Sequence, residues 1–277
     1  MRIDSHQHFW SYSAGEYPWI TEKLKRIRAD FLPQDLEREL TPVKIEGSIA
    51  VQARQTIEES RWLLNLADHY ASIKGVVGWV DLRSPRDGEQ LAELSKHPRF
   101  VGVRHVVQDE PDENFMRQPD FVRGIGELKR FPVAYDLLIY PVQLPAATQL
   151  ASKFPKQTFV LDHIAKPLIR EGIRSVWEEQ IRELAKCSNV FCKISGMVTE
   201  AKWGEWNSED FRPYLDIVFE CFGADRLMYG SDWPVCLVAG NYEPVYRLTH
   251  DYVVKNIPKA EAKIFGGNAV RAYRLKI

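Results

Sequence analysis

Residues 4–10 read Asp-Ser-His-Gln-His-Phe-Trp and place two histidines, His6 and His8, at the end of the first predicted strand, Arg2–His8. Side chains two residues apart on a strand point to the same face. Two neutral imidazoles on one face can bind a divalent metal ion or hold an oxygen atom of a ligand. A His-x-His pair alone is weak evidence, so its meaning depends on which polar residues the other strands contribute.

Short, apolar runs rich in β-branched residues recur along the chain, with helix-period segments between them. We predict eight strands, at Arg2–His8, Gly47–Ala53, Gly75–Asp81, Val101–Val107, Val133–Ile139, Thr158–Ile164, Val190–Ser195 and Arg226–Asp232. Strictly alternating strands and helices indicate a parallel sheet, either a closed barrel or an open doubly wound sheet. Eight repeats favour closure, and 277 residues suit a barrel of roughly 250 residues. We therefore expect an α/β protein with a single domain over residues 1–277, a (β/α)8 TIM barrel.

The composition excludes several classes of protein. The formal net charge is −1 with no basic block, so we expect neither a nucleic-acid partner nor a membrane-surface role. We see no signal peptide and no apolar run of the roughly 20 residues that a membrane span needs. The four cysteines form no C-x-x-C pair, which indicates free thiols and a cytoplasmic protein. A homo-oligomer stays open.

Side chains that are costly to bury gather at the carboxyl ends of the predicted strands. They are His6, His8, Gln52, Asp81, Arg104, Asp136, Asp162, His163, Lys193, Ser195 and Asp232. The active site of a parallel barrel lies at that end, because the βα loops open there. His6, His8, His163 and Asp232 offer three imidazoles and one carboxylate. This set can ligate one zinc ion and leave room for water, or hold a carbonyl group and a water molecule without a metal.

Asp232 is the predicted general base. It follows Gly230 and Ser231 and precedes Trp233 and Pro234, so the backbone turns sharply out of the strand there. A carboxylate at this turn can take a proton from water as the water attacks a carbonyl. The structural alternative is a strand-end cap or an ion pair.

A second set of residues is predicted to bind the substrate. Arg104 points inward and is always charged, with a structural ion pair to Asp81 or Asp136 as the alternative. Asp136 and Gln52 can hydrogen-bond the hydroxyl groups of a ligand, and Lys166 and Lys193 can hold a hydroxyl or a product carboxylate. The alternatives are a solvated loop lysine for Lys166 and a pair with a neighbouring acid for Lys193.

Aromatic residues complete the predicted substrate site. Trp10, Tyr140 and Trp203 lie in segments that follow strands one, five and seven, where an aromatic ring can cover an apolar face of a ligand. The alternative for the tryptophans is packing against neighbouring elements. His105 follows the inward Arg104, so alternation sends it outward, away from the site.

Four motifs together resemble the amidohydrolase superfamily, and more narrowly its sugar-lactone hydrolase branch. They are Asp4-Ser-His-Gln-His-Phe-Trp, Leu161-Asp-His-Ile-Ala-Lys-Pro, Lys193-Ile-Ser-Gly and Tyr229-Gly-Ser-Asp-Trp-Pro, and the ending Gly267-Asn-Ala-Val-Arg-Ala-Tyr-Arg-Leu fits the same branch. The resemblance spans the chain. It implies that Asp232 activates water against an L-fucono- or L-rhamnono-lactone, while His6, His8 and His163 surround the scissile carbonyl or a metal.

The sequence departs from the two-metal amidohydrolases on strands four and five. These strands offer Arg104, His105 and Asp136 in place of the bridging and second-metal ligands of those enzymes. The resemblance then implies one divalent ion, with Zn²⁺ expected, or none. A metal-dependent decarboxylase or amidohydrolase acting on another small acid is the alternative enzyme, and a barrel that only binds a ligand is the third hypothesis. Activity that survives exhaustive chelation would exclude the decarboxylase.

Overall fold

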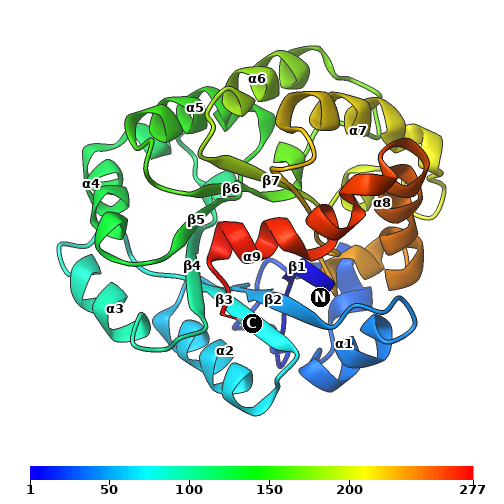
Figure 1. Ribbon diagram of the computed structural model, residues 1–277. Helices are drawn as coiled ribbons and strands as arrows, with labels where there is room; N and C mark the ends of the chain where they lie inside the picture. Colours follow the sequence, from blue (N-terminus) through cyan, green and yellow to red (C-terminus); the bar gives the residue numbers. More distant parts are fainter. Residues whose placement is uncertain (277) are drawn as a thin grey trace.

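The computed structural model describes residues 1–276, and they form one eight-stranded parallel sheet with strand order β1 to β8 (Figure 1). The strands are β1 Ile3–Gln7, β2 Gly47–Val51, β3 Ile73–Gly78, β4 Phe100–His105, β5 Ala134–Leu137, β6 Phe159–Leu161, β7 Val190–Ile194 and β8 Leu227–Tyr229. The segment after β8 returns to β1, where the His8 amide donates to the Trp233 carbonyl (2.7 Å) and the Asp232 amide donates to the His6 carbonyl (2.8 Å). These bonds close the ring, which confirms the predicted (β/α)8 barrel.

Helices surround the sheet. They are α1 Pro33–Leu40, α2 Ile57–His69, α3 Asp87–Leu94, α4 Pro119–Glu127, α5 Leu144–Lys153, α6 Ser175–Ala185, α7 Ser208–Phe222, α8 Tyr242–Asn256 and α9 Asn268–Tyr273. Among the residues described, no helix combines the length and the apolar character that crossing a membrane requires. All four cysteines lie within these residues and are free thiols, as predicted.

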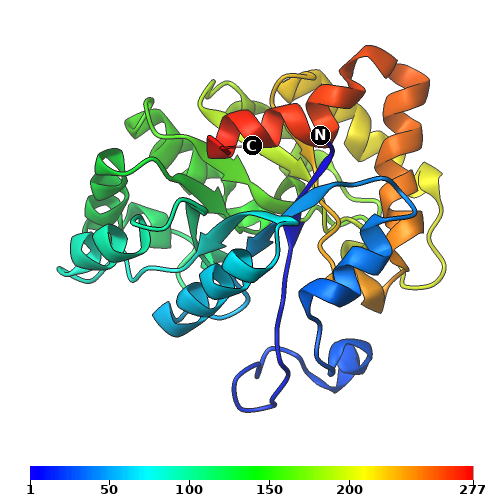
Figure 2. The ribbon, with the colours of Figure 1, turned by 60° about the horizontal axis from the view of Figure 1, so that its bottom comes forward.

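The two ends of the barrel differ. Helix α9 lies across the amino end, and the long segment after β1 projects from the opposite side (Figure 2). One buried cluster joins inward side chains of every strand to α9; it contains Ile3, Ile49, Val51, Val77, Val101, Ala134, Val160, Phe191, Met228, Ala269, Ala272, Tyr273 and Leu275. This apolar layer fills the amino end of the barrel, so a ligand site is expected at the carboxyl end.

Several predicted strands run too far. The prediction for β6 ends at Ile164 and that for β8 at Asp232, whereas the observed strands end at Leu161 and Tyr229. The polar residues after these strands take left-handed backbone conformations, with φ of 55° at His163 and 59° at Asp232. A strand cannot continue through such a residue, because its φ lies far from the extended region.

Candidate functional site

Two histidines of the first strand meet at the centre of the carboxyl end. His6 lies in β1 and His8 directly after it, and their Nε2 atoms are 3.2 Å apart. The Nδ1 atom of His8 is 2.8 Å from the Val51 carbonyl, which can only accept, so Nδ1 carries the proton. The Nε2 atom of His8 therefore presents a lone pair to the centre, and the predicted convergence of the pair is confirmed.

His163 enters the site from an unusual turn. His163, Ile164, Ala165 and Lys166 all have positive φ, between 48° and 61°, a conformation that side chains with a Cβ adopt rarely and at a cost. The turn brings the ring centroid of His163 to 4.4 Å from that of His6. The Ser195 hydroxyl holds its Nδ1 atom at 2.9 Å, so Nε2 points to the centre.

Asp232 completes the cluster from the turn after β8. Its Oδ1 atom lies 3.4 Å from Nε2 of His8, 3.8 Å from Nε2 of His6 and 3.9 Å from Nε2 of His163. A tetrahedral zinc ion with bonds of about 2.0–2.1 Å separates its ligand atoms by about 3.3 Å. The spacing of His6, His8 and Asp232 thus fits one divalent ion, with small adjustments.

Burial controls the charge of these groups. It lowers the pKa of His6 well below 6.5 and the pKa of His163 to about 4. Burial by itself raises the pKa of Asp232, but the neighbouring histidines outweigh it and hold this pKa below its ordinary value. At neutral pH His6 and His163 are therefore neutral beside an ionised carboxylate, the state that both metal binding and proton acceptance require.

A buried layer of charges lies directly beneath the histidines. Arg104 donates to Asp162 (3.0 Å), and Lys193 lies 2.6 Å from Asp136 Oδ2 and 3.0 Å from Asp162 Oδ1. The Nδ1 atom of His6 is 3.1 Å from Lys193 Nζ and 3.2 Å from Asp162 Oδ1. None of these side chains is more than 3% exposed, so the layer forms a floor under the site.

Arg104, predicted to bind the substrate, forms an ion pair, as in its structural alternative. The partner is Asp162 in place of Asp81 or Asp136, and the guanidinium also donates to the backbone carbonyl of Gln52. Gln52 is fully buried and donates its amide to the Arg104 carbonyl (3.2 Å). Both side chains thus tie β2 to β4, which leaves them little surface for a substrate.

Asp136 and Lys193 also lie out of reach of a substrate. Asp136 accepts from the Tyr273 hydroxyl (2.7 Å) and from Lys193, and neither side chain is exposed. Contact with a sugar hydroxyl was expected for both, and the structure favours the alternative, a buried pair. The reason is alternation: Ala134 and Phe191 face the barrel interior, and the residues two positions later do too.

The three aromatic residues differ in position. Trp10 is fully buried, packs against Tyr17, and donates its indole N–H to the Ala29 carbonyl, so its role is packing and the substrate contact expected for it is wrong. Trp203 is partly buried and donates to Thr199 (2.9 Å). Tyr140 is 40% exposed, with the ammonium of Lys166 5.5 Å from its ring, so this pair remains accessible.

Asp162 has no predicted role of its own, although it lies against Arg104 and Lys193 of the buried layer and against His6 above it. Its one available signal was its position two residues after the inward Val160, which predicts an inward carboxylate. His105, in contrast, behaves as predicted. It faces outward and stacks on Phe115 at 4.8 Å.

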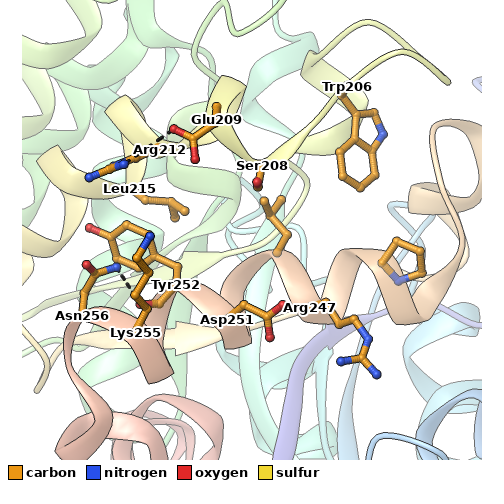
Figure 3. Close-up of a pocket in the computed structure, with 12 residues that line it drawn as sticks. Trp206, Ser208, Glu209, Arg212, Leu215, Arg247, Asp251, Tyr252, Lys255 and Asn256 are labelled. Atoms are coloured by element: carbon orange, nitrogen blue, oxygen red, sulfur yellow. Dashed lines mark hydrogen bonds and ion pairs between the residues drawn. The ribbon is translucent and has the colours of Figure 1, made fainter.

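A hollow lies outside the barrel, between α7 and α8 (Figure 3). Its lining includes Trp206, Glu209, Arg212, Arg247 and Asp251, and none of the four central residues. Arg212 and Arg247 pair with acids of their own helices. These are solvated helix surfaces, so we place the chemistry at the carboxyl end of the strands.

Fold and site together define a (β/α)8 barrel built around a histidine–carboxylate centre of the kind that metal-assisted hydrolases use. The chain belongs to the amidohydrolase family, whose model matches residues 3–275.

Relatives cover the whole chain. It is 40% identical over 286 residues to an L-fucono-1,5-lactonase from Burkholderia multivorans, covering 99% of this chain and 96% of that protein. A second L-fucono-1,5-lactonase, from Burkholderia ambifaria, is 37% identical with the same coverage. A crystal structure of an amidohydrolase from Burkholderia multivorans with bound zinc is 39% identical, covers 100% of both chains and superposes with a TM-score of 0.96.

Proposed function

We propose that this protein hydrolyses a sugar lactone of the L-fucono-1,5-lactone type to the aldonic acid. The observation that carries the proposal is the meeting of Asp232 with the Nε2 atoms of His6, His8 and His163 at the open end of the barrel. Full-length similarity to two L-fucono-1,5-lactonases supports the choice of substrate. A lactone is a cyclic ester, so the enzyme is a hydrolase acting on a carboxylic ester bond.

Asp232 acts as the base. Its ionised carboxylate accepts a proton from the water molecule that attacks the lactone carbonyl. The left-handed turn at Asp232 is held by the bond from its amide to the His6 carbonyl (2.8 Å), which fixes the carboxylate against the histidines. With exposure of 4%, this carboxylate meets little competing solvent.

His6, His8 and His163 hold the carbonyl end of the lactone. His6, His8 and Asp232 are the residues that would hold one divalent ion, with Zn²⁺ expected, and His163 lies beside them. When bound, such an ion supplies positive charge that polarises a carbonyl oxygen and acidifies water. The neutral state of His6 suits this role, because a protonated histidine cannot ligate a cation.

The remaining contacts to the sugar come from the rim. Tyr140 and Lys166 are the predicted substrate residues that stay accessible, and they lie on the loops after β5 and β6. We propose that they bind the sugar hydroxyls, with Trp203 contributing less because its indole N–H is already satisfied. A cytoplasmic location and a homo-oligomeric state stay predictions, and light scattering tests the second.

The test is a panel of lactones. Acid release from L-fucono-, L-rhamnono- and D-galactono-lactones is followed in weak buffer with a pH indicator, against the spontaneous rate without protein. We expect clear acceleration on at least one L-sugar lactone. No acceleration on any member of the panel would refute the proposal. The alternative, a metal-dependent decarboxylase or amidohydrolase, has weaker support because the two relatives of 37–40% identity over the full length are lactonases by name.

A further inference from the structure

The Nδ1 atom of His6 has two competing partners, and this feature goes beyond the role of His6 as a ligand. Lys193 Nζ lies at 3.1 Å and Asp162 Oδ1 at 3.2 Å. The ammonium can only donate and the carboxylate can only accept. Each partner therefore requires a different tautomer of a neutral imidazole. When Nδ1 of His6 accepts from Lys193, the ring proton is on Nε2; when Nδ1 donates to Asp162, the ring proton is on Nδ1.

The hydrogen bonds of the structure favour Lys193. Its ammonium donates to Asp136 Oδ2 (2.6 Å) and to His6 Nδ1 (3.1 Å), whereas Asp162 Oδ1, 3.0 Å away, receives no aligned hydrogen bond from it. With Nδ1 accepting, the Nε2–H group of His6 points at Nε2 of His8, 3.2 Å away. Nε2 of His8 is an acceptor because its Nδ1 donates to Val51. An unbroken chain of donors and acceptors thus runs from Lys193 to the Val51 carbonyl. It competes with a longer contact from Arg104, whose Nη1 lies 3.4 Å from Nε2 of His6 and can only donate.

This series of hydrogen bonds is incompatible with metal binding at His6. A ligating Nε2 atom must present its lone pair, so the proton has to move to Nδ1. Asp162 Oδ1 can accept a hydrogen bond from a protonated Nδ1. This oxygen is buried without an aligned hydrogen-bond donor, although Lys193 and His6 lie near it. The imidazole keeps one proton in both states, so the exchange needs no additional proton from solvent.

We propose that Lys193 and Asp162 are positioning residues that compete for Nδ1 of His6 and thereby set how tightly the site holds a divalent cation. Lys193 stabilises the tautomer that cannot ligate, and Asp162 stabilises the one that can. Asp136 keeps Lys193 in place and is itself held by the Tyr273 hydroxyl of α9. The inference rests on the metal-binding part of the proposed function and not on the lactone.

The first measurement uses the unmodified chain. Two-dimensional ¹H–¹⁵N NMR of ¹⁵N-histidine-labelled protein reports which ring nitrogen of each histidine carries the proton. The signal that is missing from the spectrum of His6→Asn belongs to His6. We expect His6 to be protonated on Nε2 in metal-free protein and on Nδ1 after an equimolar addition of Zn²⁺. Protonation on Nδ1 in both states would overturn the proposal.

The second measurement is the Zn²⁺ dissociation constant, by competition with a chromophoric chelator. Substitutions next to metal ligands typically change affinity by about 10–100-fold. We expect Asp162→Asn to weaken Zn²⁺ binding by that factor, and the charge-balanced double variant Lys193→Met/Asp136→Asn to tighten it about tenfold. The matched control is Tyr135→Phe, which removes a buried hydroxyl of the same strand as Asp136 that makes no hydrogen bond, and which is expected to keep the unmodified affinity.

Weaker or unchanged binding in the folded double variant would contradict the role of Lys193. If that variant does not fold, the tautomer of the unmodified chain still decides the question. Failure of the unmodified chain to bind Zn²⁺ would overturn this inference but not the lactone assay, because that assay counts released acid.

Discussion

Gly196 supports the position of His163, and replacing it with alanine is a sharp test of the site geometry. Gly196 has a φ of +61°, and a Cβ atom built on it would lie 2.6 Å from Cγ and 3.0 Å from Cβ of His163. Carbon atoms in contact prefer about 3.5–4.0 Å. Gly196→Ala therefore forces the imidazole to move by about 1 Å.

Two effects follow, and they differ in size. An alanine in the left-handed region costs about 1–2 kcal/mol of folding stability. Moving a catalytic group by about 1 Å can cost about 100-fold in rate. We expect Gly196→Ala to lose about 1–2 kcal/mol of stability and about 100-fold in kcat/KM on the best lactone.

The matched control is Gly172→Ala. Gly172 has nearly the same φ, +67°, but nothing lies within 4 Å of the Cβ that a substitution would add. Urea denaturation should show a similar stability loss in both variants, while lactone hydrolysis should fall only in Gly196→Ala. Equal activity of the two variants would show that the position of His163 does not limit catalysis.

Two further predictions concern stability. Trp10→Phe should reduce stability by about 1–3 kcal/mol, because it leaves a void and an unpaired Ala29 carbonyl, and should leave KM unchanged; a large rise in KM would restore Trp10 to the substrate site. Burial raises the pKa of Glu59 to about 7 from 4.5 despite bonds from the Ala53 and Arg54 amides. The folded protein then holds this proton between pH 4.5 and 7 while the unfolded chain has released it, so stability falls as pH rises, by on the order of 3 kcal/mol. Urea denaturation at several pH values should show this slope in the unmodified chain and a flatter one in Glu59→Gln; identical slopes would contradict the assignment.

The barrel and its four central residues could be predicted from the sequence, because ionisable side chains at the strand ends of a parallel sheet are costly to bury unless they form a polar site. His6 and His8 were predictable in detail, since two-residue periodicity fixes their common face.

The environment of these residues was harder to predict. Four consecutive residues with left-handed backbone conformation follow Asp162, so the side chains of Asp162 and His163 point in different directions. The conformational propensities of these residues do not predict such a turn. The partners of Lys193 and Arg104 depend on which strands lie opposite each other across the barrel. The burial of Trp10 depends on how the loop after β1 folds back onto Phe31, a tertiary contact without a local signal.

The most direct test of the central claim is the rate of acid release from L-fucono-1,5-lactone by the unmodified chain and by Asp232→Asn. Asparagine has nearly the same shape but cannot accept the proton of water, and general-base catalysis typically contributes about 10²–10⁴-fold. We predict a loss of that size with an unchanged circular dichroism spectrum. A folded Asp232→Asn variant that retains about a tenth or more of the activity would contradict the role of Asp232 as the base.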